Sequence, residues 1–156
     1  MLCYDIPGRG KIEIENVVID YNGTIAVDGK AIEGVKELIE RLKKHVNVFI
    51  LTADTYGTAR NECKNFGVNI MTFPNENAGF YKKEIVRKLG GKKTLCVGNG
   101  YNDIPMFKES ILTIAVIERE GACSKLILNS DIVTRSITEA IELILDEKRM
   151  KATLRN

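Results

Sequence analysis

The stretch around Asp20 holds the side chains best suited to phosphoryl chemistry. Asp20 follows the apolar run Val17–Ile19, and Asn22, Gly23 and Thr24 come directly after it. An aspartate at the tip of a strand can attack phosphorus and form an aspartyl-phosphate. Because the carboxylate and the phosphate are both anions, that reaction needs a cation beside them. Backbone N–H groups in the glycine loop can add to the binding of a phosphate.

Three later segments supply the remaining groups that such a reaction needs. Thr52 ends an apolar run, Lys82 and Lys83 lie near the start of a helical pattern, and "GNGYND" contains Asn99 and Asp103. Mg²⁺ takes oxygen ligands and bridges carboxylates to phosphates. A hydroxyl and an ammonium can hold the other phosphoryl oxygens, over which charge spreads in the transition state. The residue types therefore fit a magnesium-assisted phosphoryl transfer.

Strand and helix patterns alternate along the chain and must bring these segments together. Apolar periodicity and turn residues predict an edge strand over 11–15 that leads into a buried strand over 16–20. Further strands are expected at 46–52, 68–73, 93–98, 111–117 and 131–134. Helices are expected at 30–44, 55–67, 80–89, 101–110, 121–130 and 136–149. This alternation predicts an α/β fold with a mainly parallel sheet and helices on both faces. In such sheets a ligand crevice lies at the carboxyl ends of the strands.

Length and composition restrict the number of domains, the kinds of partner and the kinds of metal site. The 156 residues fit a single domain over 1–156, with a C-terminal tail over about 147–156 left unassigned. A net charge of +2 from 23 basic and 21 acidic residues does not favour nucleic-acid or membrane partners. Four cysteines without a CxxC pair, and no apolar run near the ~20 residues that span a bilayer, favour the reducing cytoplasm. A single histidine excludes a multi-histidine zinc site.

These motifs taken together resemble those of the haloacid dehalogenase (HAD) superfamily, and most closely the phosphorylation domain of P-type ATPases. The resemblance rests on the segments "DYNGT", "LTADTYGTA", "VGNGYNDIPMF" and "SDIVTRSITEAIELI" together with Lys82 or Lys83. It covers about residues 15–145, and the chain as a whole is similar to the small soluble P-type ATPase-like phosphatases. The resemblance implies a three-layer Rossmann-like HAD fold, and no insertion is long enough for a cap domain.

The resemblance also implies a role for each residue. Asp20 would be the nucleophile and a metal ligand, and Asn22 would give the Mg²⁺ its backbone carbonyl. Asn99 and Asp103 would complete the metal site. The phosphoryl group of the substrate would be bound by Gly23, Thr24, Thr52, Ala53 and either Lys82 or Lys83. The helical phase of "KKEIVRKL" favours Lys82.

Two amides depart from the family pattern. Hydrolytic members read Asp-x-Asp-x-Thr, and the second Asp protonates the leaving group and then activates water; Asn22 cannot carry that proton. General acid–base help is worth about 10²–10⁴-fold in rate. P-type ATPases also lack a carboxylate at this position and keep a longer-lived aspartyl-phosphate. Asn99 stands where an acidic Mg²⁺ ligand is usual, so metal binding should be weaker unless phosphate supplies the missing charge. We therefore expect phosphoryl transfer with slow hydrolysis.

Partners and alternatives follow from the same features. Without a cap, the substrate can be a small phosphorylated molecule or a larger one, and a homo-oligomer would shield the site. The main alternative, which Asn22 and Asn99 motivate, is a non-catalytic phosphate- or metal-binding module, or pseudophosphatase. A signalling receiver domain ranks below both, because receivers are phosphorylated on an Asp at the end of a middle strand, where this chain has Thr52. Asp28 and Asp54 are interpreted as turn or capping acids.

Overall fold

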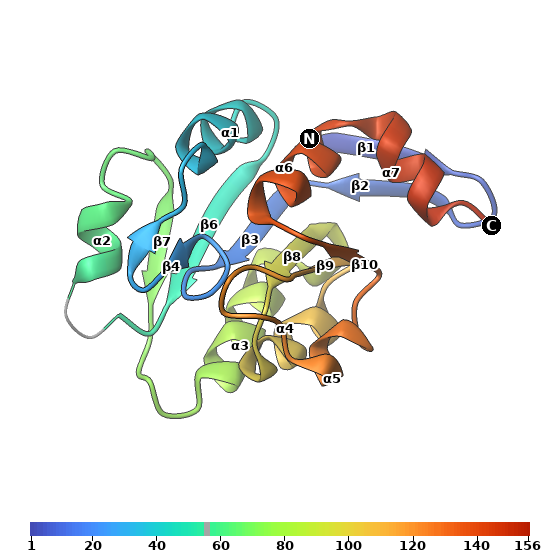
Figure 1. Cartoon of the computed structure of the whole chain (residues 1–156). Helices are drawn as coiled ribbons and strands as arrows, with labels where there is room; N and C mark the ends of the chain where they lie inside the picture. The colour runs from blue at the N-terminus through green and yellow to red at the C-terminus, as the bar shows by residue number, and fades with distance from the viewer. Residues whose placement is uncertain (55–56) are drawn as a thin grey trace.

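The fold is a parallel α/β sheet in the computed structural model, which describes residues 1–54 and 57–156 (Figure 1). Six parallel strands lie in the order β10-β9-β8-β3-β6-β7. Their bounds are β3 Asn16–Asp20, β6 Asn47–Thr52, β7 Asn69–Thr72, β8 Thr94–Gly98, β9 Leu112–Val116 and β10 Ile132–Thr134. The central β3 pairs with both β6 and β8 and is buried along its whole length. This confirms the expected fold class and explains the near-continuous apolar run before Asp20.

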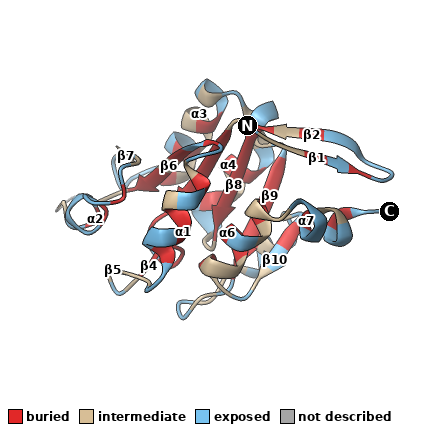
Figure 2. Cartoon of the chain, turned by 90° about the horizontal axis from the view of Figure 1, so that it is seen from above, coloured by how far each residue is buried: buried red, intermediate tan, exposed pale blue. Residues whose placement is uncertain are grey.

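Helices cover both faces of this sheet (Figure 2). Alternate residues of β3 point to opposite faces, so Val17 and Ile19 join one apolar cluster and Val18 joins another. The first cluster includes residues of α1 (Val35–Leu42), α6 (Ile137–Leu145) and α7 (Glu147–Leu154). The second includes residues of α3 (Ala78–Leu89), α4 (Ile104–Glu109) and α5 (Ser124–Ile127). The core is thus two apolar layers that hold β3 and its Asp20 in a fixed place.

The N-terminal part differs from the expectation of an edge strand leading into β3. β1 (Leu2–Ile6) and β2 (Gly10–Ile14) form a separate antiparallel hairpin, so the strand predicted over 11–15 does not join the main sheet. A second small hairpin, β4 (Ala26–Val27) with β5 (Lys30–Ala31), was not predicted. Two-residue strands carry too little periodicity to be recognised in a sequence.

Several helices also differ from the prediction. α1 begins only after Gly34, and α2 (Thr58–Glu62) is much shorter than 55–67. Asp54 accepts a hydrogen bond from the backbone N–H of Ala59 at 2.8 Å, so its predicted capping role is confirmed. From the sequence, Thr55 or a neighbouring residue is also expected to cap the helix over 55–67, and Thr55 lies outside the described residues. The helix expected over 136–149 ends at Leu145, because Asp146 caps a new helix, α7, by accepting from two backbone N–H groups.

The unassigned tail therefore forms most of α7, which packs beside the β1–β2 hairpin. Short 3₁₀ turns η1 (Gly91–Lys93) and η2 (Tyr101–Asp103) precede β8 and α4. All four cysteines are free thiols. Among the described residues, none of the helices combines the length and the apolar character that crossing a bilayer needs.

Candidate active site

The carboxyl ends of β3, β6 and β8 meet at one edge of the sheet, as the parallel topology requires. Asp20 is the last residue of β3, Thr52 the last of β6, and Gly98 the last of β8. A glycine is required at position 98 for a steric reason, because an added Cβ would lie 2.5 Å from Oδ2 of Asp103. The missing side chain lets Asp103, at the end of the η2 turn, approach the end of β8.

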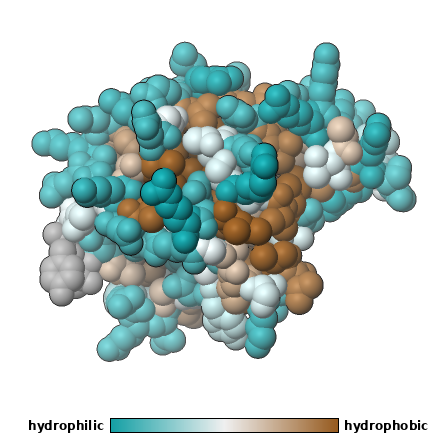
Figure 3. Space-filling view, viewed as in Figure 1, coloured by the Kyte–Doolittle hydropathy of each residue, from teal (hydrophilic) through white to brown (hydrophobic). Residues whose placement is uncertain are grey.

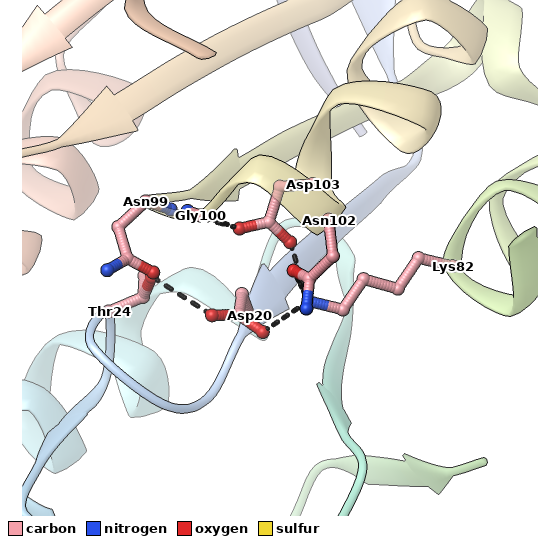
Figure 4. Close-up of polar contacts among 7 residues, drawn as sticks. All are labelled: Asp20, Thr24, Lys82, Asn99, Gly100, Asn102 and Asp103. Carbon is pink, nitrogen blue, oxygen red and sulfur yellow. Dashed lines mark hydrogen bonds and ion pairs between the residues drawn. The ribbon is translucent and has the colours of Figure 1, made fainter. Parts of the chain in front are cut away.

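A buried ion cluster forms the centre of this edge (Figure 4). The Nζ atom of Lys82, from α3, lies 2.7 Å from Oδ1 of Asp20 and 2.6 Å from Oδ1 of Asp103. Its third contact is Oδ1 of Asn102 at 2.9 Å. All three residues that carry charge are buried, with Lys82 only 3% exposed. An ammonium has three donors, and these three acceptors use them all.

Lys82 thus reaches the site, as its helical phase favoured. Lys83, the next residue of α3, instead lines a separate hollow together with Tyr101 and Ile104. A one-residue step turns a helical side chain by about 100°, so the two lysines cannot point to the same place. The pair therefore offers a matched comparison of one buried and one outlying ammonium on the same helix.

The charges in this cluster shift one another's protonation. Burial, followed by repulsion from Asp103, raises the pKa of Asp20 to about 7, although Lys82 opposes the shift. Burial lowers the pKa of Lys82, but the nearby Asp20 and Asp103 carboxylates outweigh it, so the pKa of Lys82 is raised overall. We infer that Lys82 stays charged at neutral pH, while burial makes Asp20 harder to ionise than a free carboxyl group.

Asp103 connects this cluster to the loop after β8. Its Oδ2 accepts hydrogen bonds from the backbone N–H groups of Asn99 at 3.1 Å and Gly100 at 2.9 Å. Its Oδ1 accepts from Lys82. Both oxygens are therefore engaged with Lys82 and the loop, so the expected role of Asp103 as a metal ligand stays a prediction.

On the other side of Asp20, the polar partners are neutral. The buried Thr24 hydroxyl lies 3.4 Å from Oδ2 of Asp20 and 3.3 Å from Oδ1 of Asn99. The amide nitrogen of Asn99 donates to the carbonyl of Gly121 at 3.1 Å, which directs Oδ1 toward Thr24. Gly23, at φ +78°, leaves room for Asn99, because a Cβ there would lie 2.3 Å from the amide nitrogen.

The backbone N–H groups of Gly23 and Thr24, which were expected to contact phosphate, already have partners within the chain. The N–H of Gly23 donates to the carbonyl of Ala26 at 2.7 Å, and that of Thr24 donates to the carbonyl of Tyr21 at 3.2 Å. Both backbone donors are thus used inside the turn, and the phosphate contacts expected of Gly23 and Thr24 stay a prediction. The turn geometry that requires Gly23 also consumes its donor.

A cleft of about 240 Å³ opens above the ion cluster. Five of the predicted residues line it: Asp20, Asn22, Ala53, Lys82 and Asn99. Its other lining residues, Phe73, Asn75, Ala78, Gly100 and Asn102, were not among the predicted site residues. Asn102 is the acceptor that completes the Lys82 contacts, and its place inside "GNGYND" was the available signal. Phe73 and Asn75 follow the weakest predicted strand and belong to no motif.

Thr52 lies beside this cleft with an unsatisfied hydroxyl. It is 1% exposed, and in the described part of the chain its Oγ1 has no hydrogen-bond partner. A buried polar atom without a partner is costly unless a ligand or water completes it. A phosphate oxygen bound at the end of β6 would accept a hydrogen bond from this hydroxyl.

The oxygen atoms near Asp20 suit a divalent cation only in part. No group of three or more His, Cys, Asp or Glu side chains able to hold a metal occurs within residues 1–54 and 57–156. However, Oδ2 of Asp20 and Oδ1 of Asn99 converge on the same Thr24 hydroxyl. Mg²⁺ commonly uses one or two carboxylates, with water and substrate phosphate completing its shell. The donor set therefore fits a weak Mg²⁺ site that phosphate strengthens.

The family model described as haloacid dehalogenase-like hydrolase matches residues 4–110. The chain belongs to this family. The resemblance seen in the four motifs is thereby confirmed, and the HAD-like hydrolase fold accounts for the edge at which Asp20, Thr52, Lys82 and Asp103 meet.

Individual relatives agree with this placement. An uncharacterised protein of Methanocaldococcus jannaschii is 46% identical over 74 residues, which are 47% of this chain and 80% of that protein. A soluble P-type ATPase-like phosphatase of the same organism is 30% identical over 123 residues, which are 77% of this chain. The match spans 45% of that phosphatase, less than half of its length.

Among solved structures, a 3-deoxy-D-manno-octulosonate 8-phosphate phosphatase from Moraxella catarrhalis shares the fold with a TM-score of 0.67 and 19% identity. The similarity covers 91% of this chain and 94% of that one, whose structure holds magnesium, phosphate and a KDO molecule.

Proposed function

We propose that this HAD-like hydrolase is a Mg²⁺-dependent phosphatase or phosphotransferase that works through an aspartyl-phosphate on Asp20. The observation that carries the proposal is the buried Asp20 carboxylate held 2.7 Å from Lys82 on the floor of a cleft. Thr52 ends the neighbouring strand β6, and a phosphoryl oxygen would give its buried Oγ1 the partner that it lacks among the described residues. The phosphatase name of one relative supports the same reading.

The residues present can carry the first half of the reaction. A carboxylate oxygen of Asp20 forms a bond to phosphorus, and the ester P–O bond breaks with its electron pair on the leaving oxygen. Thr52 has a hydroxyl to give to a phosphoryl oxygen while charge develops there, and Lys82 would do the same by exchanging one of its three present acceptors for a phosphoryl oxygen. Asp20, Asn22 and Asn99 would hold a Mg²⁺ ion, whose chemistry here is to neutralise the two anions. Asp103 is a positioning residue, because it touches Lys82 and the loop.

The amide of Asn22 affects both the departure of the leaving group and the later hydrolysis. The leaving oxygen has to take its proton from water, because Asn22, which lines the cleft, has no proton to give. Attack of water on the aspartyl-phosphate likewise has no carboxylate base at this position. We therefore propose that the aspartyl-phosphate forms most readily from an acyl phosphate, whose leaving carboxylate needs no proton, and that it is hydrolysed slowly.

A second candidate is a phosphate- or metal-binding module without turnover. The specific observation in its favour is that Asn22 and Asn99, both lining the cleft, carry amides where hydrolytic relatives have acids. Under this reading Lys82 and Thr52 would still bind phosphate. Measurable phosphate binding with no trapped aspartyl-phosphate would favour the module.

The test of the main proposal is the Asp20→Asn variant. With acetyl phosphate and Mg²⁺, the wild type should yield an acid-stable but hydroxylamine-sensitive phosphoprotein, and Asp20→Asn should yield none. Asp28→Asn is the matched control, because Asp28 is exposed at a turn with φ 52°, a conformation that Asn tolerates. Equal labelling of wild type and Asp20→Asn would refute the mechanism.

A homo-oligomer that shields the capless site, and a cytoplasmic location, remain proposals. Large apolar side chains lie exposed near one edge of the sheet, including Leu128 at 84% and Val133 of the edge strand β10 at 43%. Figure 3 shows hydrophobic surface gathered over the region of α5, β9 and β10. Sedimentation velocity at micromolar concentration decides the first point, and a monomer would contradict it.

A further inference from the structure

One wall of the cleft is aromatic and is built from outside the motif residues. Phe73, in the loop between β7 and α3, lines the cleft. Its ring stacks on Tyr81 of α3 with centroids 6.2 Å apart and planes 15° apart. Tyr81 in turn meets Phe80 edge-to-face at 5.6 Å. This row of three rings runs from the cleft to the surface, where Phe80 is 58% exposed.

The stacking gives Phe73 a fixed orientation. Offset-stacked and edge-to-face aromatic pairs stabilise each other's orientation beyond the effect of the area they bury. A loop residue backed by such a contact presents its ring to the cleft as a ready surface. Ala78 of α3 also lines the cleft and, being small, covers little of that surface.

The remaining polar residues of the cleft carry no net charge. Four asparagines line it, namely Asn22, Asn75, Asn99 and Asn102. Among the described lining residues, the ionisable side chains are Asp20 and Lys82, which pair with each other. The proposed reaction already uses both of them on the phosphoryl group. A second anionic group on a substrate would therefore find amides in this cleft and no unengaged cation.

We propose that the substrate is a phosphate monoester of an uncharged, ring-bearing alcohol, whose ring packs against Phe73. This inference rests on the proposed function and adds the class of leaving group to it. In the transfer, the ester P–O bond breaks, phosphorus bonds to Asp20, and the alcohol takes its proton from water. Asn75, on the same loop as Phe73, is placed to hydrogen-bond the hydroxyl or amide groups of that alcohol.

Three probes separate the parts of this proposal. Phenyl phosphate has the ring without extra charge, 4-carboxyphenyl phosphate adds one carboxylate to the same ring, and acetyl phosphate has no ring. The wild type should turn over phenyl phosphate with a kcat/KM about tenfold above that for the carboxylated ester, because the carboxylate loses hydration without gaining a cation. Asn75→Lys supplies a cation at the rim and should reverse this preference.

The aromatic wall is tested by Phe73→Ala, with Phe80→Ala as the matched control. Phe80 belongs to the same row of rings but does not line the cleft. Phe73→Ala should raise KM for phenyl phosphate about tenfold and leave acetyl phosphate within about twofold. Phe80→Ala should change neither. Equal losses on all three probes in Phe73→Ala, or a wild-type preference for the carboxylated ester, would overturn the inference.

Binding without turnover separates this inference from the proposed function. Calorimetry with Mg²⁺ should show phenylphosphonate binding the wild type about tenfold more tightly than methylphosphonate, and Phe73→Ala should abolish that difference. Equal affinities in the wild type would overturn the aromatic wall even if the enzyme is active. A retained difference with no turnover of any ester would overturn only the proposed reaction.

Discussion

The two sides of Asp20 are built in opposite ways. On one side, Lys82 contacts Asp20 and Asp103 at 2.7 and 2.6 Å inside the protein. On the other side, the neutral Thr24 hydroxyl lies 3.4 Å from Oδ2 of Asp20 and 3.3 Å from Oδ1 of the neutral Asn99. On the charged side the contacts are short and use all three donors of Lys82. On the amide side the contacts are longer.

This difference separates two tasks of a phosphoryl-transfer site. Holding a phosphoryl group needs fixed charge and preorganised donors, which the charged side provides. Releasing the group to water needs a proton carrier and a well-held metal, which the amide side provides poorly. Under the proposed function, this arrangement therefore suits capture of a phosphoryl group better than its hydrolysis.

The largest expected effect comes from removing the charge that organises the first side. Lys82→Met keeps an unbranched stem but leaves two buried carboxylates without their cation. We expect kcat/KM to fall about 10³-fold, since deletion of one preorganised donor costs about 10²–10³ and the ammonium also offsets repulsion. Steady-state kinetics with phenyl phosphate measures the loss.

Lys83→Met is the control for this experiment, because it makes the same chemical change one residue along α3 and outside the cleft. Its kcat/KM should stay within about twofold of the wild type. A comparable loss in both variants would mean that Lys82 acts through the general charge of α3, and the contrast between the two sides would lose its basis.

A smaller effect, of opposite sign, should come from restoring a proton carrier on the amide side. Asn22→Asp gives the cleft a carboxyl group at the position from which relatives protonate the leaving group. We expect hydrolysis of the aspartyl-phosphate to speed up about 10- to 100-fold, at the lower end of what general acid–base groups contribute because the surroundings are unadapted. Rapid-quench measurement of the phosphoprotein lifetime tests this.

Asn75→Asp serves as the control for Asn22→Asp, because it adds a carboxylate to the same cleft on the loop that carries Phe73. The phosphoprotein of this variant should live as long as that of the wild type. An unchanged lifetime in Asn22→Asp would show that another group limits hydrolysis, and the amide at position 22 would not explain slow turnover.

The sequence predicted which residues reach the site better than it predicted their contacts, for physical reasons. Motif order and strand ends placed Asp20, Thr52 and Lys82 at one edge, because parallel strands leave their carboxyl ends together. The role of Asn102 and the consumed N–H of Gly23 depend on angles within short turns, which residue type does not specify. Phe73 reaches the cleft through a loop contact with Tyr81 that no periodic pattern encodes.

The fold shows the same division. Elements whose pattern follows their burial, such as β3 and α3, were predicted nearly to the residue. The short hairpins β1–β2 and β4–β5, and the break at Asp146, depend on pairing and capping choices that compete within a few tenths of a kcal/mol up to about 1 kcal/mol. Those elements were missed or merged.

The smallest expected effect concerns the stability cost of the charged side. The folded-state pKa of Asp20 is raised to about 7 from an ordinary value of 3.8, with burial as the first cause. A raised pKa means that the folded protein holds the proton more tightly than the unfolded chain. The contribution of Asp20 to stability is therefore full below about pH 4 and is lost as the pH rises toward 7.

Asp20→Asn removes this dependence while Lys82 keeps Asp103 as its partner. In metal-free buffer we expect the variant to gain stability over the wild type as the pH rises from 4 to 8, by on the order of 2 kcal/mol. Urea unfolding across that range measures it, and Asp28→Asn, exposed at its turn, should run parallel to the wild type. If the Asp20→Asn curve ran parallel too, Lys82 would fully compensate the buried carboxylate. The charged side would then be stable in itself, instead of being held in place by the two apolar layers around β3.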